Sequence, residues 1–571
     1  MILIPQPKKA ERRDGEFTIG YGSYLVLDES CGPLLTKQAM LFLDALEEET
    51  GYRPALTRGK GRDGDIILRR EEALGSEDVL GQGYTLEIRP EGIILTGGEK
   101  GPWHGMQTIL QMAGQQGAVL PAMSIHDRPD IRNRGFYHDV TRGRVPKLDW
   151  LKKLADRMAR YKLNQMQLYI EHTFLFRDFS EIWRDVTPLT AEDILELDRY
   201  CLDRGIELVP SLSTFGHLYK ILGSKHYSHL CELEGSESMP FSLRGRMHHH
   251  TINVSSPESL EFIKGKIREF AALFSSGQFN ICADETFDLG KGRSSGLKER
   301  LGVHRLYINY VKDLCECVIS CGKRPMFWGD VIAGEPELLK ELPSETICLN
   351  WGYAKNQRED ETRALDAAGA VQYLCPGVCG WNHLIPLYEN AYCNIKIMCD
   401  YARKYEAVGV LNTDWGDFLH INHPEFSIPG MIYGAACSWN AQPPAWEEMN
   451  RQISILEYDD STGRLVGMLA NTQELHGFTW EMAVRFKELK TGAAPEYDTD
   501  HRQYLQEHME SMEGVDEKNR RLEEITGELY GLLPHMDRRS RNMVKKYVIA
   551  VEGIGLFNEL GKVITKWDYG A

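Results

Sequence analysis

The sequence predicts an α/β protein with a central (β/α)8 TIM barrel, a small α/β domain before it and a helical region after it. Short strand patterns alternate with amphipathic helices from about residue 131, eight such strands precede residue 440, and polar and aromatic residues gather just after them. A doubly wound open sheet is the alternative, but no GxGxxG or GxxxxGK[ST] segment follows an early strand. We expect domain ranges of 1–128, 129–440 and 441–571.

The first 128 residues have the pattern of a separate packing domain without catalytic spacing. Strands are expected at 24–27, 65–68, 83–88 and 92–97. The last two surround Arg89-Pro90-Glu91, a typical turn, and so predict a hairpin. Apolar residues at helical spacing predict helices over 34–51 and 101–114.

The barrel strands are expected at 135–140, 165–170, 207–212, 279–283, 324–328, 346–351, 371–375 and 409–412. Amphipathic helical patterns lie between most of them, including 147–161, 191–204, 259–274 and 306–321. The carboxyl ends of the strands of such a barrel carry the chemistry. The residues just after each strand are therefore the candidate site.

These strand ends are polar and aromatic, and they carry Asp139, Arg142, Glu171, His172, His217, Asp284, Glu285, Trp328, Trp351, Trp381, Trp415 and Asp417. A single Trp at such a place is more often a packing residue, and a single Asp or His more often caps the next helix. Together they favour a sugar site, because sugar rings stack on aromatic faces and glycosidic cleavage needs carboxylates. Neither a nucleophile elbow nor HExxH spacing is evident, so we expect no metal and no cofactor.

The adjacent carboxylates Asp284 and Glu285 follow the fourth strand. Alone, this dipeptide is more often the start of a helix than a catalytic pair. At a strand end that faces a pocket, two carboxylates can instead differ in pKa and divide acid and base roles. The surrounding aromatic and polar strand ends favour the catalytic interpretation.

Composition limits the classes of partner. The 571 residues carry a net charge of −17, which argues against a general nucleic-acid or anionic-membrane binder. The chain lacks an apolar run of about 18 residues, and its first residues lack the apolar core of a secretory signal. The 13 cysteines show no Cys-x-x-Cys pairs, so we expect reduced thiols and a cytoplasmic protein.

The strand-end residues resemble glycoside hydrolase family 20, the β-N-acetylhexosaminidases. The resemblance covers about residues 1–440 and rests on the order of the helix segment 105–111, Arg134-Gly135-Phe136-Tyr137-His138-Asp139-Val140-Thr141-Arg142, Phe215-Gly216-His217, Ala283-Asp284-Glu285, Trp328, Trp351 and Trp415-Gly416-Asp417. It implies an exo-acting enzyme that removes terminal β-linked GlcNAc or GalNAc from an oligosaccharide or glycoconjugate.

The resemblance also implies a retaining, substrate-assisted mechanism, which differs from the usual two-carboxylate scheme. Glu285 would be the general acid and then the general base. Asp284 would hold the 2-acetamido group so that its carbonyl oxygen attacks the anomeric carbon and forms an oxazolinium. Glu285 would start protonated while Asp284 stays charged.

The remaining roles also follow from the resemblance. Arg134 would bind the C3 and C4 hydroxyls, and His217 would support the acid/base residue. The other implied substrate contacts are Trp328, Trp351 and Trp415 as walls, Asp417 at O4 or O6, and Glu171, His172 and Trp381.

Several positions depart from the family pattern. The family usually has Gly at 283, His at 143, an Asp pair at 171–172 and Glu at 211, where this chain has Ala283, Gly143, Glu171-His172 and Ser211. A strand-seven Tyr that supports the acetamide has no clear match near 375–382. These departures leave open the sugar epimer and the residues that support the acetamide.

Two alternatives remain open. A glycosidase of another specificity could use Glu171 or Asp417 as a carboxylate nucleophile with Glu285. A sugar-binding barrel without catalysis is the second. Residues after 441 have helical patterns at 505–527 and 538–560, which would pack on the barrel or form a homodimer.

Overall fold

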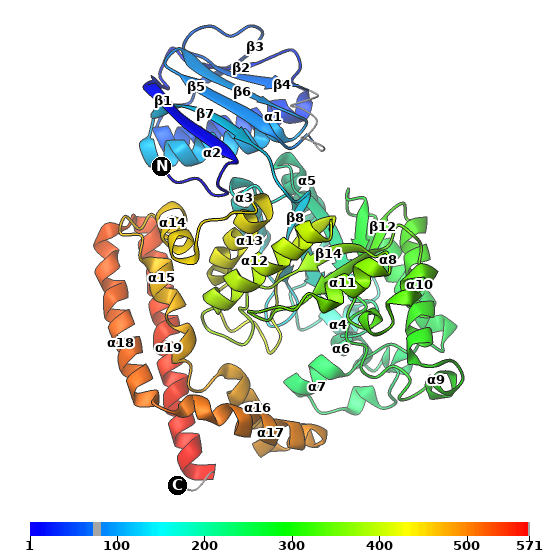
Figure 1. Cartoon of the computed structure of the whole chain (residues 1–571). Coiled ribbons are helices and arrows are strands. Elements are labelled where there is room, and N and C mark those ends of the chain that lie inside the picture. The colour runs from blue at the N-terminus through cyan, green and yellow to red at the C-terminus, as the bar shows by residue number, and fades with distance from the viewer. Residues whose placement is uncertain (72–80, 569–571) are drawn as a thin grey trace.

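The computed structural model describes residues 1–71 and 81–568 and confirms the predicted fold class (Figure 1). A small α/β domain lies at one end of a closed eight-stranded parallel barrel, and the C-terminal helices run along the side of the barrel.

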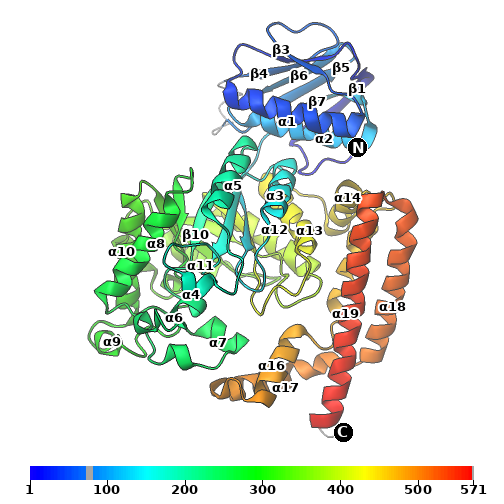
Figure 2. The ribbon, with the colours of Figure 1, turned by 180° about the vertical axis from the view of Figure 1, so that it is seen from behind.

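The N-terminal domain is a seven-stranded sheet in the order β1-β7-β5-β6-β4-β2-β3. Helices α1 (Pro33–Thr50) and α2 (Gly101–Gln116) cover one of its faces (Figure 2). The predicted strands are present as β2 (Tyr24–Leu27), β4 (Ile66–Arg70), β5 (Tyr84–Arg89) and β6 (Gly92–Gly97).

Three further strands of this sheet were not predicted, namely β1 (Lys9–Thr18), β3 (Ala55–Arg58) and β7 (Val119–Asp127). The strands β1 and β3 form the two edges of the sheet, and nine of the ten residues of β1 are exposed. An exposed edge strand needs no apolar alternation, so it leaves little signal in the sequence.

All eight predicted barrel strands are present, as β8 (Asn133–Asp139), β9 (Gln165–Ile170), β10 (Glu207–Leu212), β11 (Gln278–Asn280), β12 (Arg324–Trp328), β13 (Ile347–Trp351), β14 (Val371–Cys375) and β15 (Gly409–Asp414). The outer layer contains α3 (Leu148–Arg160), α5 (Ala191–Asp203), α8 (Pro257–Ala271), α10 (Val303–Ser320), α11 (Asp360–Ala367), α12 (Tyr388–Lys404) and α13 (Ile428–Trp439). Strand β11 is shorter than predicted and ends at Asn280.

The barrel interior is filled by side chains. Buried rings and aliphatic groups stack along it, including Tyr137, Tyr169, Val209, Met326, Leu349, Tyr373 and Leu411, with Trp328 and Trp415 in the same cluster. A ligand therefore reaches only the carboxyl ends of the strands, as in other barrels of this type.

Asp127, the last residue of β7, joins the N-terminal domain to the barrel. Its carboxylate accepts hydrogen bonds from Tyr84 Oη (2.8 Å), Lys162 Nζ (3.0 Å) and Trp439 Nε1 (2.8 Å). All four residues are buried, and Lys162 and Trp439 belong to the barrel part of the chain. The two domains thus share a buried, hydrogen-bonded joint.

The C-terminal region is helical and packs on the barrel. It comprises α14 (Trp446–Tyr458), α15 (Leu465–Ala470), α16 (Trp480–Thr491), α17 (Asp498–His508), α18 (Val515–Leu532) and α19 (Arg538–Asp568). The helical pattern predicted at 505–527 is confirmed in part, at the end of α17 and over the first 13 residues of α18, but the chain turns between these helices, where Gly514 adopts a φ of 65°. The helical pattern at 538–560 is confirmed as part of α19.

Helices α16 and α17 extend from this region across the carboxyl end of the barrel toward α7 (Leu243–His248) (Figure 1). We call residues 480–508 the arm. Within residues 1–71 and 81–568, the structure has no helix with the length and apolar character that a membrane span requires.

Candidate active site

The Asp284–Glu285 pair lies on an irregular segment after β11. Cys282, Ala283 and Glu285 have φ values of 55°, 68° and 46°, in the left-handed region that residues with side chains rarely adopt. No helix follows directly, since the next one, α9, begins at Ser295. The pair is therefore not a helix cap, and its backbone conformation is the kind found at functional sites.

Neighbouring elements hold this segment in place. Tyr307 Oη donates a hydrogen bond to the Ala283 carbonyl (2.9 Å), and the Glu285 amide donates to Asp330 Oδ2 (3.0 Å). The backbone of Gly216 approaches so closely that a Cβ there would lie 2.6 Å from the Asp284 carbonyl oxygen. The loop after β10, the third barrel strand, must therefore carry glycine at this position.

His217 faces both carboxylates. Its Nε2 lies 3.2 Å from Glu285 Oε2 and 3.6 Å from Asp284 Oδ2. Burial disfavours the imidazolium, but the two carboxylates outweigh it and raise the pKa of His217 to about 10. Burial would raise the pKa of Glu285, and the contact and charge of His217 instead lower it. The His217–Glu285 pair therefore holds one proton at neutral pH, and it resides on His217.

Asp330, two residues after β12, is a buried acid that contacts the pair and is not among the predicted site residues. Burial, followed by the charge of Asp284, raises the pKa of Asp330 to about 8. Its Oδ1 is buried without a hydrogen-bond partner among the described residues. Asp330 is thus a neutral acid at neutral pH that accepts the Glu285 amide hydrogen bond.

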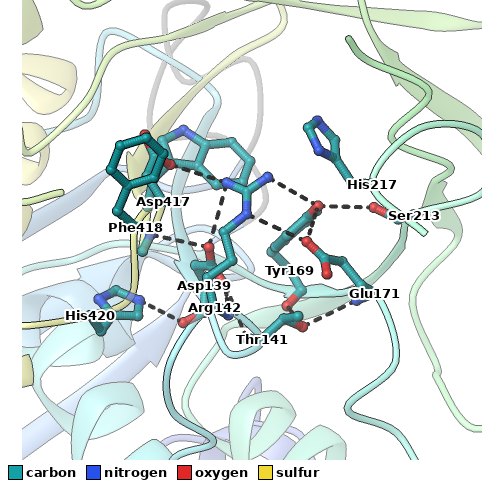
Figure 3. Close-up of polar contacts among 12 residues, drawn as sticks. Asp139, Thr141, Arg142, Tyr169, Glu171, Ser213, His217, Asp417, Phe418 and His420 are labelled. Carbon is teal, nitrogen blue, oxygen red and sulfur yellow. Dashed lines mark hydrogen bonds and ion pairs between the residues drawn. The ribbon is translucent and has the colours of Figure 1, made fainter. Parts of the chain in front are cut away.

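Arg142 is the centre of a second polar group (Figure 3). Its guanidinium contacts Asp417 Oδ1 (3.1 Å), Glu171 Oε1 (3.4 Å) and Tyr169 Oη (3.3 Å), and it lies over the rings of Tyr169 and Trp415. Burial disfavours its charge, but these neighbours raise its pKa. Arg142 therefore orients the carboxylates of Glu171 and Asp417, which lie at the same carboxyl end of the barrel as Glu285.

Asp139 fixes the loop on which Arg142 lies. Its Oδ1 accepts from the amides of Thr141 and Arg142 (both 2.9 Å), and its Oδ2 accepts from the Gly416 amide (3.0 Å). One carboxylate thus ties the loop after β8 to the loop after β15. Figure 3 shows the contact between Asp139 and Arg142.

The two predicted carboxylates beside Arg142 differ from each other. Burial opposes the charge of Glu171, but Arg246 at 3.3 Å, His172 and Arg142 lower its pKa. Burial raises the pKa of Asp417 to about 6, despite Arg142. The side chain of Asp417 is 25% exposed and that of Glu171 only 3%, so Asp417 is the more accessible of the two. His172, whose pKa burial lowers, is a buried neighbour of Glu171.

The predicted tryptophans gather around Tyr353. The Tyr353 ring stacks on Trp351 (centroids 5.2 Å apart) and contacts Trp381 (4.9 Å), and its hydroxyl accepts from Trp415 Nε1 (2.7 Å). Trp328 is completely buried against Tyr137 and Trp415. It therefore supports the wall from below and does not line it, contrary to the prediction.

Tyr353 is not among the predicted site residues, because the tyrosine that supports the acetamide was expected near strand seven. It lies two residues after β13, the sixth strand, in the segment Trp351-Gly352-Tyr353. Its place beside a strand-end Trp was the available signal.

The prediction that Arg134 binds sugar hydroxyls is wrong. Arg134 is the second residue of β8 and lies at the amino end of the barrel, where its guanidinium donates to the carbonyls of Ile131, Arg132 and Lys162 and to Gln82 Oε1. It is 1% exposed and faces the N-terminal domain. Arg142, at the other end of the same segment, is the arginine of the site.

His217, Asp284 and Glu285 also bring three ligand-type atoms within 4.8 Å of one another. This set could hold a cation, although its close contacts and pKa shifts equally suit proton transfer.

Two family models match the chain: glycosyl hydrolase family 20, domain 2, over residues 1–128, and the family 20 catalytic domain over residues 132–413. A β-hexosaminidase of Vibrio furnissii is 25% identical over 436 residues, which cover 69% of this chain and 68% of that protein. A lacto-N-biosidase of Bifidobacterium bifidum is 22% identical over 474 residues, or 78% of this chain and 40% of that protein.

Solved structures share the fold. A family 20 exo-β-N-acetylglucosaminidase of Vibrio harveyi matches with a TM-score of 0.64 at 20% identity, covering 82% of this chain and 78% of its own. A chitobiase of Flavobacterium johnsoniae matches with a TM-score of 0.66 at 17% identity, covering 100% of this chain and 93% of its own. With matched models over both its N-terminal domain and its barrel, the chain belongs to glycosyl hydrolase family 20.

Proposed function

We propose that this enzyme removes terminal β-linked N-acetylhexosamine, GlcNAc or GalNAc, from oligosaccharides or glycoconjugates. The observation that carries the proposal is the adjacent Asp284–Glu285 pair, held in a left-handed backbone conformation with His217 3.2 Å from the Glu285 carboxylate. Two neighbouring carboxylates with different contacts can act on one sugar in different ways.

Glu285 acts as general acid and then as general base. Its side chain is 30% exposed, so it can reach a glycosidic oxygen. Because the pKa of His217 is raised and that of Glu285 is lowered, we assign the proton to His217 before the substrate binds, and not to Glu285 as predicted. Glu285 donates a proton to the leaving oxygen, His217 supplies it to Glu285, and Glu285 later accepts a proton from the attacking water.

Asp284 orients the substrate's own nucleophile. Its carboxylate accepts the N–H of the 2-acetamido group, whose carbonyl oxygen then attacks the anomeric carbon as the glycosidic bond breaks. The C1–O bond formed to the acetamide gives an oxazolinium cation, and water opens it with net retention. The side chain of Asp284 is only 12% exposed, which suits a charge held close to a developing cation.

The remaining site residues bind the sugar. We assign Arg142, with Glu171 and Asp417, to the ring hydroxyls in place of Arg134. Trp351, Trp381 and Trp415 form the aromatic wall, and Tyr353 Oη is the hydroxyl that can meet the acetamide carbonyl oxygen. His172 acts through Glu171.

The alternatives make different demands on the same residues. Glu171 is a poor nucleophile candidate, because Arg142 and Arg246 contact it and it is almost fully buried. Asp417 is the better candidate for a carboxylate nucleophile, and a sugar-binding barrel would require neither residue to react.

Hydrolysis of 4-nitrophenyl β-GlcNAc and β-GalNAc against the β-glucoside and β-galactoside tests the proposal. Cleavage should require the acetamido group. The substitution Glu285→Gln should lower kcat by about 10²- to 10⁴-fold on both acetamido substrates, and Asp284→Asn should lower kcat by a similar factor. If the Asp284→Asn variant kept the kcat of the wild type, or if a covalent ester were trapped on Asp417, the carboxylate-nucleophile alternative would be supported instead.

We also propose a cytoplasmic location, division of the chain near residues 128 and 440, and a homodimer. All 13 cysteines are free thiols in the described part of the chain, which supports a reducing compartment.

The homodimer rests on α19, where the exposed apolar residues Ile549, Leu556 and Val563 recur every seven positions and would suit contact with a second copy of the chain. Cell fractionation, limited proteolysis and light scattering test the three proposals.

A further inference from the structure

We propose a subsite for the leaving sugar on the outer side of Glu285, formed by Phe287, His248 and Tyr497. It deepens the proposed function, on which it rests, by specifying the substrate class: an N-acetylhexosamine linked to another pyranose ring. Its third residue comes from the arm, far from the barrel in the sequence.

Phe287 lies at the position that a leaving group must pass. Its amide donates a hydrogen bond to the Glu285 carbonyl (2.8 Å), so Phe287 is part of the turn directly after the general acid. Phe287 is 40% exposed, which is unusual for a phenylalanine beside a buried site. The group that receives the proton from Glu285 is the glycosidic oxygen, and the leaving sugar lies beyond it.

His248 forms a flat platform with Phe287. The two rings are stacked, with centroids 4.7 Å apart and an interplanar angle of 15°. Burial and the nearby Arg244 lower the pKa of His248 to about 4, against the opposing effect of Glu285. The imidazole is therefore neutral at neutral pH, and the platform presents an uncharged aromatic surface beside an acid.

Tyr497 closes the platform from the arm. Its ring meets His248 edge-on, at 5.5 Å and 70°. Its hydroxyl lies 3.0 Å from His249 Nε2, and His249 Nδ1 lies 2.9 Å from Asp288 Oδ1. The chain Asp288–His249–Tyr497 thus ties the arm to the residue after Phe287.

Further contacts hold the arm at this place. Glu488 accepts the Leu243 amide hydrogen bond at the start of α7, and Arg244 Nε lies 3.1 Å from Asp500 Oδ2. Asp500 also accepts from Arg485 (2.8 Å). Figure 1 shows α16 and α17 reaching α7 from the opposite side of the barrel end. The arm is therefore positioned to take part in binding.

The chemistry of the platform favours a sugar. Pyranose rings present an apolar face to aromatic rings, while their hydroxyls need polar neighbours. Here the polar neighbours are Glu285 and His249. A further exposed ring, that of Phe241, contacts Tyr219 and lies on the segment that leads into α7. An oligosaccharide is therefore the substrate that we infer.

Two substrates with the same N-acetylglucosaminyl group test the subsite: N,N′-diacetylchitobiose, whose leaving group is a sugar, and N-acetyl-β-glucosaminyl fluoride, whose leaving group is one atom. Phe287→Ala should lower kcat/KM for the disaccharide about 5- to 10-fold, because an aromatic stacking contact contributes about that factor. The value for the fluoride should stay within about 2-fold.

Phe287→Tyr keeps the stacking ring and should restore disaccharide hydrolysis. Tyr497→Phe keeps the ring and loses the link to His249, so it should cause a smaller loss. Tyr530→Ala on α18, 53% exposed and outside the arm, is the matched control and should change neither substrate.

Equal effects of Phe287→Ala on both substrates, or no effect on the disaccharide, would overturn the subsite while wild-type hydrolysis upholds the proposed function. Failure of the wild-type enzyme on both substrates would overturn the proposed function itself. Thermal unfolding of each variant separates a loss of folding from a loss of binding.

Discussion

The two ends of the barrel each bury an arginine from one nine-residue segment, and the two arginines have opposite surroundings. Arg134, at the amino end, donates to three backbone carbonyls and one amide oxygen. Burial lowers its pKa to about 9, with Asp127 opposing. Arg142, at the carboxyl end, contacts the carboxylates of Asp417 and Glu171, and its pKa is raised.

This contrast shows that burial of a charge does not identify a site, whereas the type of partner does. The amino end is a joint in which fixed, neutral oxygens satisfy the cation. The carboxyl end holds more carboxylates than cations, and several of them shift in pKa or remain accessible, as at Asp330, Asp417 and Glu285. Such shifts cluster at functional sites.

Matched substitutions should separate the two ends most strongly. Arg142→Lys keeps the charge but loses the fork that orients Asp417 and Glu171, and we expect kcat/KM to fall by about 10²-fold. Arg134→Lys loses donors to buried carbonyls and should cost about 2–4 kcal/mol of unfolding free energy, while kcat/KM per folded molecule stays unchanged.

Steady-state kinetics with active-site titration and urea unfolding measure the two effects. A large loss of kcat/KM in folded Arg134→Lys, or full activity of Arg142→Lys, would remove the functional distinction between the two ends.

The position of Arg134 could have been predicted from the sequence. The strand was expected to begin at Gly135, and a residue before a parallel barrel strand lies at the end opposite the chemistry. The family resemblance led to the wrong arginine. The eight strands and the Asp284–Glu285 pair were predictable, because periodicity and strand order define them.

Other features of the site depend on tertiary contacts that leave no local pattern. Cys282 and Ala283 adopt positive φ values that neither residue type indicates, since the surrounding structure imposes them. The pairing of Asp330 with the Glu285 amide joins residues 45 positions apart. The approach of the arm to α7 likewise follows from packing between regions more than 200 residues apart.

His217→Gln should change the pH dependence of the carboxyl end. In the wild type, the pKa of His217 near 10 lets the pair with Glu285 keep its proton through neutral pH. Gln can still donate to Glu285 but carries no proton to transfer, so Glu285 must hold it alone. The alkaline limb of kcat/KM should therefore move to lower pH, by about 1 unit or more.

The stability of the wild type should change with pH in the same region. A histidine whose folded pKa is raised stabilises the fold fully below its unfolded value of about 6.5, and this stabilisation is lost as pH rises through about 10.

His229→Gln, at an exposed histidine beside Glu258, is the control for the kinetic prediction and should leave the alkaline limb of kcat/KM in place. An unshifted limb in His217→Gln would show that His217 does not hold the transferred proton.

Asp330→Asn should give the smallest effect and the sharpest test of the excess of acids at the carboxyl end. The amide oxygen of Asn can still accept the Glu285 amide, so activity near pH 6 should change little. The folded pKa of Asp330, about 8, lies above its ordinary value of 3.8. The stability linked to protonation is therefore fully present below about pH 4 and is lost as pH rises toward 8. Asn does not ionise, so the Asn variant should unfold at a Tm ~2 °C above the wild type at pH 8 and at a similar Tm at pH 4.

Asp330→Leu, which removes the acceptor, should instead lower both Tm and activity. Thermal unfolding between pH 4 and 8 that runs parallel for Asp330→Asn and the wild type would mean that Asp330 is ionised in the folded enzyme, and that the carboxyl end tolerates its full set of negative charges without a buried neutral acid.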